Sequence, residues 1–62
     1  MILDITFPDG AVKKFENGIT PFQIAKSLSN SLAKNIVSAS FNGNIIELST
    51  KLSENGSLKF YS

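Results

Sequence analysis

The side chains that could carry out chemistry are few, and their types exclude most kinds of catalytic centre. The chain contains no histidine and no cysteine, so the commonest general base near neutral pH, the commonest zinc ligand and a thiolate nucleophile are missing. Metal catalysis and a histidine-dependent triad are therefore excluded. The carboxylates are spread along the chain: Asp4, Asp9, Glu16, Glu47 and Glu54. We expect them to be surface and turn residues, and we predict no catalytic, cofactor-binding or metal-binding residue.

The cationic side chains are six lysines, without any arginine. Arginine provides the planar fork that recognises phosphates and guanine edges, so sequence-specific recognition of nucleic acid is disfavoured. A net charge of +1 still permits weak contact between lysines and RNA phosphates. The candidates lie on the predicted second strand and along the predicted helix and its extension: Lys13, Lys14, Lys26 and Lys34. The alternative is that these lysines keep a small domain soluble and protect an edge strand.

Phe22 is the candidate for contact with a protein partner. It falls within the predicted helix but off the apolar stripe, so its ring is a candidate exposed apolar group. The alternative places the ring at the start of the helix, packed beside the neighbouring loop. These two interpretations stay open at the level of the sequence.

One substantial helix is predicted over residues 20–28. Thr20 suits the N-cap, Pro21 suits the first helical position, and Gln23 completes a capping box with Thr20. Ile19 and Ile24 occupy the two positions of a hydrophobic staple. An apolar stripe that needs a sheet to cover it follows along one face: Ile24, Ala25 and Leu28. Residues 31–35 are predicted to add one short turn anchored by Leu32.

Alternating apolar residues and turn signals predict strands over residues 2–7, 11–16, 36–41, 44–48 and 57–61. The side chains predicted to face the core are Leu3, Ile5, Phe7, Phe15, Val37, Ala39, Phe41, Leu58 and Phe60, with Leu52 tucked in from a loop. Turn geometry is expected at every glycine, and Asn42-Gly43 is the strongest hairpin signal.

The order of these elements is hairpin, helix, hairpin-like pair and final strand. A right-handed crossover then places the helix across one face of a mixed sheet of four to five strands. This predicts an α+β, β-grasp (ubiquitin-like) fold, with the last strand central beside the first. We expect residues 1–62 to be a single domain excised from a larger protein. The apolar runs are too short for a membrane span, and a cytoplasmic location is expected.

Several short motifs follow one another across nearly the whole chain: Phe7-Pro8-Asp9-Gly10, Thr20-Pro21, Ile24-Ala25, Ser27-Leu28-Ser29, Ser31-Leu32-Ala33-Lys34, Phe41-Asn42-Gly43, Leu48 and Asn55-Gly56. In this order and spacing, the chain resembles the TGS domain of threonyl-tRNA synthetases. Some GTPases and the bifunctional guanosine-tetraphosphate enzymes share this domain. The last group usually carries a histidine shortly after the helix, and its absence here favours the synthetases.

The resemblance implies a non-catalytic N-terminal accessory module, regulatory or RNA-associated, of an enzyme that charges tRNA with threonine. It implies that the parent enzyme uses ATP, Mg and Zn in domains outside these residues. Its implied partners are the other domains of the parent and, through weak lysine-mediated contacts, tRNA. The alternative function is a ubiquitin-like interaction module that docks a neighbouring domain or partner through Phe22. A nucleotide-sensing role also stays open, although no glycine-rich loop is present.

Overall fold

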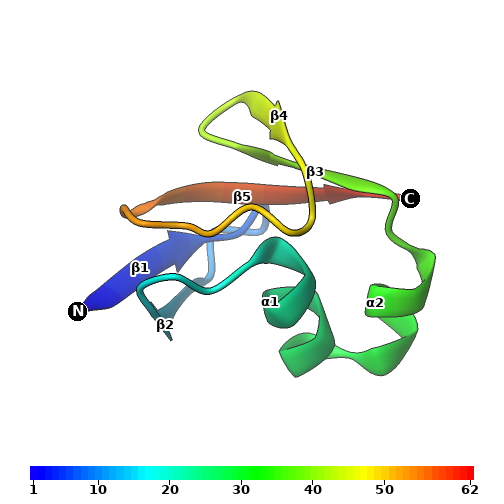
Figure 1. Ribbon diagram of the computed structural model, residues 1–62, viewed down its shortest axis with the longest axis horizontal. Helices are drawn as coiled ribbons and strands as arrows, with labels where there is room; N and C mark the ends of the chain where they lie inside the picture. Colours follow the sequence, from blue (N-terminus) through cyan, green and yellow to red (C-terminus); the bar gives the residue numbers. More distant parts are fainter.

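Five strands form one sheet, and two short helices lie against one of its faces in the computed structural model, which describes residues 1–62 (Figure 1). The elements are β1 (Ile2–Thr6), β2 (Val12–Glu16), α1 (Pro21–Leu28), α2 (Asn30–Asn35), β3 (Ser38–Phe41), β4 (Asn44–Ile46) and β5 (Gly56–Tyr61). Neither helix has the length and apolar character needed to cross a membrane.

The strands lie in the order β2-β1-β5-β3-β4. The last strand in the sequence is central and runs parallel to β1, while all other neighbours are antiparallel. This confirms the predicted α+β, β-grasp arrangement. The edge position of β2 also explains its sequence, because Phe15 faces the core while Val12 lies on the opposite, exposed side.

The core fills the space between the sheet and α1. It consists of buried side chains from four strands or loops and one helix: Leu3, Ile5, Ile24, Ala39, Phe41, Leu52 and Leu58. The sequence predicts all seven of these residues to be buried. Ile24 belongs to the predicted helical stripe, and the other six face inward from a strand or loop. Phe7 and Phe15 pack beside this core, with their rings edge to face at 6.4 Å between centroids.

The prediction that Leu28 is covered by the sheet is wrong, because 40% of this residue is exposed. Leu28 is the last residue of α1, and the chain enters α2 almost directly after it. The apolar stripe is therefore buried at Ile24 and Ala25 only. Leu28 instead borders a surface hollow together with Leu32 and Phe60.

The prediction that Val37 faces the core is also wrong. The second helix extends to Asn35, and Ile36 forms its C-cap by donating its backbone N–H to the carbonyl of Leu32. The strand begins only at Ser38, so the alternation does not reach back to Val37. As a result Ile36 is buried, whereas Val37 is 73% exposed.

The ends of the helices follow the predicted local rules. The Thr20 hydroxyl accepts a hydrogen bond from the Gln23 N–H at 3.2 Å, and the Gln23 side chain accepts one from the Thr20 N–H at 3.0 Å. Ser29 ends α1 and begins α2, because its N–H donates to the Ala25 carbonyl while its hydroxyl accepts from the Leu32 N–H. The two helices therefore share one capping residue.

Two of the three Asn-Gly pairs, Asn42-Gly43 and Asn55-Gly56, have different roles. Asn42 and Gly43 both have positive φ, at 51° and 84°, as a type I′ hairpin turn requires. Gly56 does not have positive φ, so the turn predicted there is wrong. A Cβ at Gly56 would lie 2.5 Å from the Phe41 ring, so glycine is needed because another part of the chain comes too close.

Candidate functional site

The two helices bring three of the predicted contact residues to one place. Phe22 and Lys26 are four residues apart on α1 and therefore lie on the same side of that helix. The shared cap at Ser29 holds α2 beside α1, so that Lys34 approaches the same side. These residues line a hollow of about 320 Å³, whose complete lining is Phe22, Lys26, Asn30, Ala33 and Lys34. We call it the helical hollow.

The ring of Phe22 is half exposed, although its backbone is well anchored. Its N–H donates to the carbonyl of Leu48 at 3.1 Å, and its neighbour Pro21 is buried. The side chain itself is 43% exposed and is not among the residues packed against the core. The backbone that carries this aromatic ring is thus held at a fixed place on the surface.

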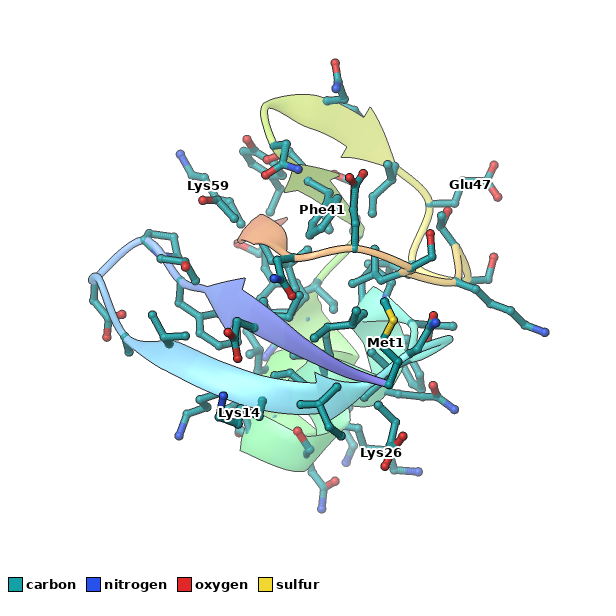
Figure 2. The ribbon with its side chains drawn as sticks, turned by 90° about the vertical axis from the view of Figure 1, so that its left-hand side faces the viewer. Met1, Lys14, Lys26, Phe41, Glu47 and Lys59 are labelled. Carbon is teal, nitrogen blue, oxygen red and sulfur yellow. The ribbon has the colours of Figure 1, made fainter.

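The helical layer, residues 20–36, is unevenly charged relative to the rest of the chain. It contains Lys26 and Lys34 and none of the five acidic residues. The remaining residues hold four lysines and five acids. The layer is therefore locally cationic by two charges, while the other residues sum to one negative charge. Figure 2 shows Lys26 near the helices, and Lys59 and Glu47 toward the β4 end.

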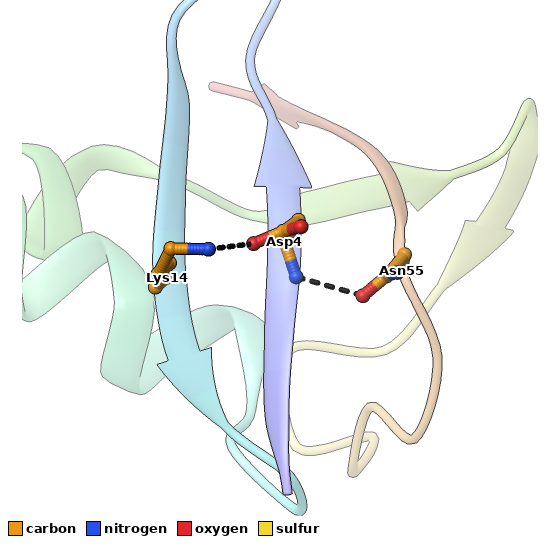
Figure 3. Close-up of polar contacts among 3 residues, drawn as sticks. All are labelled: Asp4, Lys14 and Asn55. Atoms are coloured by element: carbon orange, nitrogen blue, oxygen red, sulfur yellow. Dashed lines mark hydrogen bonds and ion pairs between the residues drawn. The ribbon is translucent and has the colours of Figure 1, made fainter.

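Lys14 has a different environment, because it faces an acidic residue across the β1–β2 pair. Its Nζ lies 2.8 Å from a carboxylate oxygen of Asp4, while the Asp4 N–H donates to the Asn55 side chain at 2.8 Å (Figure 3). The two side chains of the ion pair are largely exposed, at 74% and 48%. The pair therefore adds little stability, but it matches the charge of Lys14.

Lys13 lies at neither of these places. It borders a second hollow of about 370 Å³ that also includes Asp9 and the exposed part of Leu28. The four lysines proposed from the sequence are thus divided: Lys26 and Lys34 border one hollow, Lys14 is paired with Asp4, and Lys13 borders another hollow that Asp9 also lines. They do not form one continuous basic patch.

Two features of the surface were not recognised from the sequence. Asn30 and Ala33 complete the helical hollow, and the four-residue spacing of Phe22, Lys26, Asn30 and Lys34 is the signal that could have identified it. Val37 and Ile45 are exposed at 73% and 68%, and both border a third hollow of about 540 Å³ beside β4. The exposure of Val37 was not recognised, because the alternation of apolar residues predicts that its side chain faces the core.

The remaining polar groups do not assemble a catalytic or metal-binding constellation. No group of three or more acidic, histidine or cysteine side chains is arranged to hold a metal ion. Tyr61 donates or accepts a hydrogen bond with the Ser40 hydroxyl at 3.2 Å, and the Lys59 ammonium lies 5.3 Å from the centre of the Tyr61 ring. Ser40 is buried, so its contact with Tyr61 is part of the packing of the sheet.

Comparison with known proteins identifies the family. Residues 3–62 match the TGS domain. The chain is 52% identical over 60 residues to a threonine–tRNA ligase of Flavobacterium psychrophilum and 56% identical over 59 residues to one of Enterococcus faecalis. A Streptococcus pneumoniae threonine–tRNA ligase is 50% identical over 58 residues.

These matches cover 94–97% of this chain but only 9% of each relative. The similarity therefore concerns one small segment of proteins about ten times as long, and that segment is itself a non-catalytic domain. Together with the β-grasp topology, the match over nearly every residue shows that the chain belongs to the TGS domain family.

Proposed function

We propose that this chain is a non-catalytic, N-terminal accessory domain of a threonine–tRNA ligase and that it contacts tRNA through its helical layer. Identities of 50–56% to three threonine–tRNA ligases support the parent enzyme. In this proposal the parent is cytoplasmic and charges tRNA with threonine using ATP. The Mg and Zn of the parent belong to its other domains, which are also the partners of this chain.

The observation that carries the RNA contact is the placement of charge. Lys26 and Lys34 flank one hollow in a layer that lacks acidic residues. Lysine ammonium groups bind phosphates as point charges, without the geometry needed for base-specific recognition. The contact is therefore expected to be weak, sensitive to salt and independent of sequence.

A salt titration tests this proposal. The 62-residue chain is mixed with a threonine tRNA transcript between about 0.02 and 0.2 M salt, and affinity is measured by fluorescence anisotropy. We expect the logarithm of the affinity to fall with the logarithm of salt concentration. The Lys26→Ala/Lys34→Ala variant should reduce that slope by about two, since each lysine contributes about one phosphate contact.

The matched control is Lys13→Ala/Lys14→Ala, which removes the same charge from the β1–β2 hairpin. Because Lys14 is already paired with Asp4, this variant should reduce the slope by less than the first one does. Equal effects of the two variants would show that only net charge matters. The absence of any salt-dependent binding would refute the RNA contact.

A second function, docking onto another domain of the parent, is favoured by a different surface. We propose that Val37 and Ile45 form this contact, because they are more exposed than Phe22 and border one hollow. The relatives are far longer than this chain, so neighbouring domains are available to cover the surface. Phe22, which shares its hollow with two lysines, suits this role less well.

The test uses Val37→Ser/Ile45→Ser in the full-length ligase. Limited proteolysis should release the TGS domain faster from this variant than from the unsubstituted full-length ligase. The isolated domain with the same two substitutions should unfold at an unchanged denaturant concentration. Phe22→Ser is the control and should not change the rate of release. Unchanged release of the double variant would contradict docking at this surface.

A further inference from the structure

The helical hollow is lined by an aromatic ring as well as by two lysines, and contact with phosphates alone would not require that ring. We propose that this hollow binds one unpaired RNA nucleotide, with its base stacked on Phe22 and the neighbouring phosphates contacted by Lys26 and Lys34. This inference rests on the proposed RNA contact and specifies the form of RNA that is recognised. It predicts a preference for single-stranded or looped RNA.

The size of the hollow favours a single planar group. Its volume of about 320 Å³ is near the lower end of the range of about 300–1,000 Å³ for small-molecule pockets. Phe22 and Ala33 provide apolar surface, whereas Asn30 provides an amide that can both donate and accept hydrogen bonds. One base matches this combination of an apolar face and a polar edge.

The arrangement of ring and lysines matches that of sites for single-stranded nucleic acid. Such sites combine cationic groups along the backbone with aromatic side chains on which bases stack, and they tolerate many sequences because every base has a π face. A duplex would offer its phosphates to the lysines but keep its bases stacked inside. Phe22 would then contribute nothing to binding.

An acidic protein segment is a poorer match for the same residues. Its carboxylates would pair with Lys26 and Lys34, but the face of the Phe22 ring is the negative part of its quadrupole and does not attract carboxylates. The helical layer contains no acidic residue that would repel an RNA backbone. Charge complementarity is the same for both partners, so it is the ring that favours a nucleotide.

Substitutions at Phe22 separate stacking from general attraction. Phe22→Leu keeps an apolar side chain without a ring face, and Phe22→Trp keeps and enlarges the stacking surface. Both variants should fold, because Phe22 is half exposed and is not part of the core cluster. Circular dichroism of each variant checks this before binding is measured.

The experiment compares three probes by fluorescence anisotropy at low salt. They are a single-stranded RNA of about eight nucleotides, which fits the site size of small single-strand-binding folds, a duplex with the same number of phosphates, and a polyglutamate peptide. We expect the unmodified chain to prefer the single strand. Phe22→Leu should weaken that binding by about 5- to 100-fold, leave the duplex unchanged and keep the salt dependence, while Phe22→Trp retains affinity.

The outcomes distinguish this inference from the function on which it rests. If Phe22→Leu has no effect while Lys26→Ala/Lys34→Ala weakens binding, the stacking site is refuted but the RNA contact stands. Equal affinity of the unmodified chain for single strand and duplex also refutes the site. No binding of any RNA removes both proposals. Polyglutamate binding with the same dependence on Phe22 would identify an acidic protein as the partner instead.

Discussion

The helical layer and the β1–β2 hairpin each carry two of the lysines that the sequence offered for RNA contact. In the hairpin, Lys14 is paired with Asp4 at 2.8 Å, and Lys13 borders the same hollow as Asp9. In the helical layer, Lys26 and Lys34 border a hollow with no carboxylate. The difference shows that the number of lysines in an element predicts a binding surface less well than the positions of the nearby acids.

Each pattern of charge follows from the geometry of its element. The antiparallel register places Lys14 directly opposite Asp4, and opposite charges at such positions attract one another across the strands. On the helices, Phe22 rather than an acid lies four residues before Lys26, so no ion pair forms along the helix. The hairpin pairs Lys14 internally, whereas Lys26 and Lys34 border a hollow without a carboxylate and are left for a partner.

The largest expected effect concerns the anchor that keeps the helical layer in place. Ile24 lies on the buried face of α1 and is fully buried, so Ile24→Ala should lower the free energy of unfolding by about 2–5 kcal/mol. In a domain of this size that is a large part of the total stability. Urea unfolding followed by circular dichroism measures the change.

Val37→Ala is the control for this measurement, because Val37 is mostly exposed. It should change the free energy of unfolding by no more than about 0.5 kcal/mol. Similar losses for Ile24→Ala and Val37→Ala would mean that the helices are not anchored by the core. The helical hollow would then have no fixed geometry.

A smaller effect is expected at the cap that starts the helical layer. Thr20→Ala removes the acceptor for the Gln23 N–H and should destabilise the domain by about 1 kcal/mol. Thr50→Ala is the matched control, since Thr50 is an exposed loop residue outside both helices. Equal losses of stability in the two variants would show that the capping box does not stabilise the start of α1.

A single substitution can give the helical layer the acid that it lacks. Asn30→Asp adds a carboxylate of the same shape to the helical hollow and should lower the affinity for RNA about fivefold, as expected for a charge a few ångströms away in water. Stability should not fall, because Asn30 lies in the first turn of α2, where the helix dipole favours an acid.

Anisotropy with the single-stranded RNA probe measures this change in affinity, and Asn44→Asp is the control. Asn44 begins β4, at an exposed position away from the helices, and the substitution changes the net charge by the same amount. It should lower the affinity less than Asn30→Asp does. Equal effects would show that RNA responds to the total charge rather than to the helical hollow.

Local rules allowed much of the fold to be predicted. The capping box at Thr20 and Gln23 and the hairpin at Asn42-Gly43 depend on neighbouring residues only, and both are present. The central place of β5 also followed from the order of the elements. These predictions needed only the spacing of polar, apolar and turn-forming residues.

The errors arose where distant parts of the chain decide the outcome. The sequence predicts Gly56 to be a turn residue. In the structure, glycine is needed there because the Phe41 ring leaves no room for a Cβ. The ends of α1 and α2 determined the exposure of Leu28 and Val37, and periodicity alone does not give those ends. The environments of the four lysines likewise depend on which strands pair. The sequence alone does not show that pairing.

The smallest expected effect comes from making the hairpin resemble the helical layer. Asp4→Asn removes the carboxylate that pairs with Lys14 while leaving the hydrogen bond from the Asp4 N–H to Asn55 available. An exposed ion pair of this kind contributes about 0–1 kcal/mol, so the free energy of unfolding should change little. The affinity for RNA should rise about twofold at low salt, because one cation becomes free and the net charge increases.

In the double variant Asp4→Asn/Lys14→Ala that rise should disappear. A rise that persists without Lys14 would show that pairing with Asp4 does not keep the hairpin from binding RNA, and the contrast between the two surfaces would need another cause.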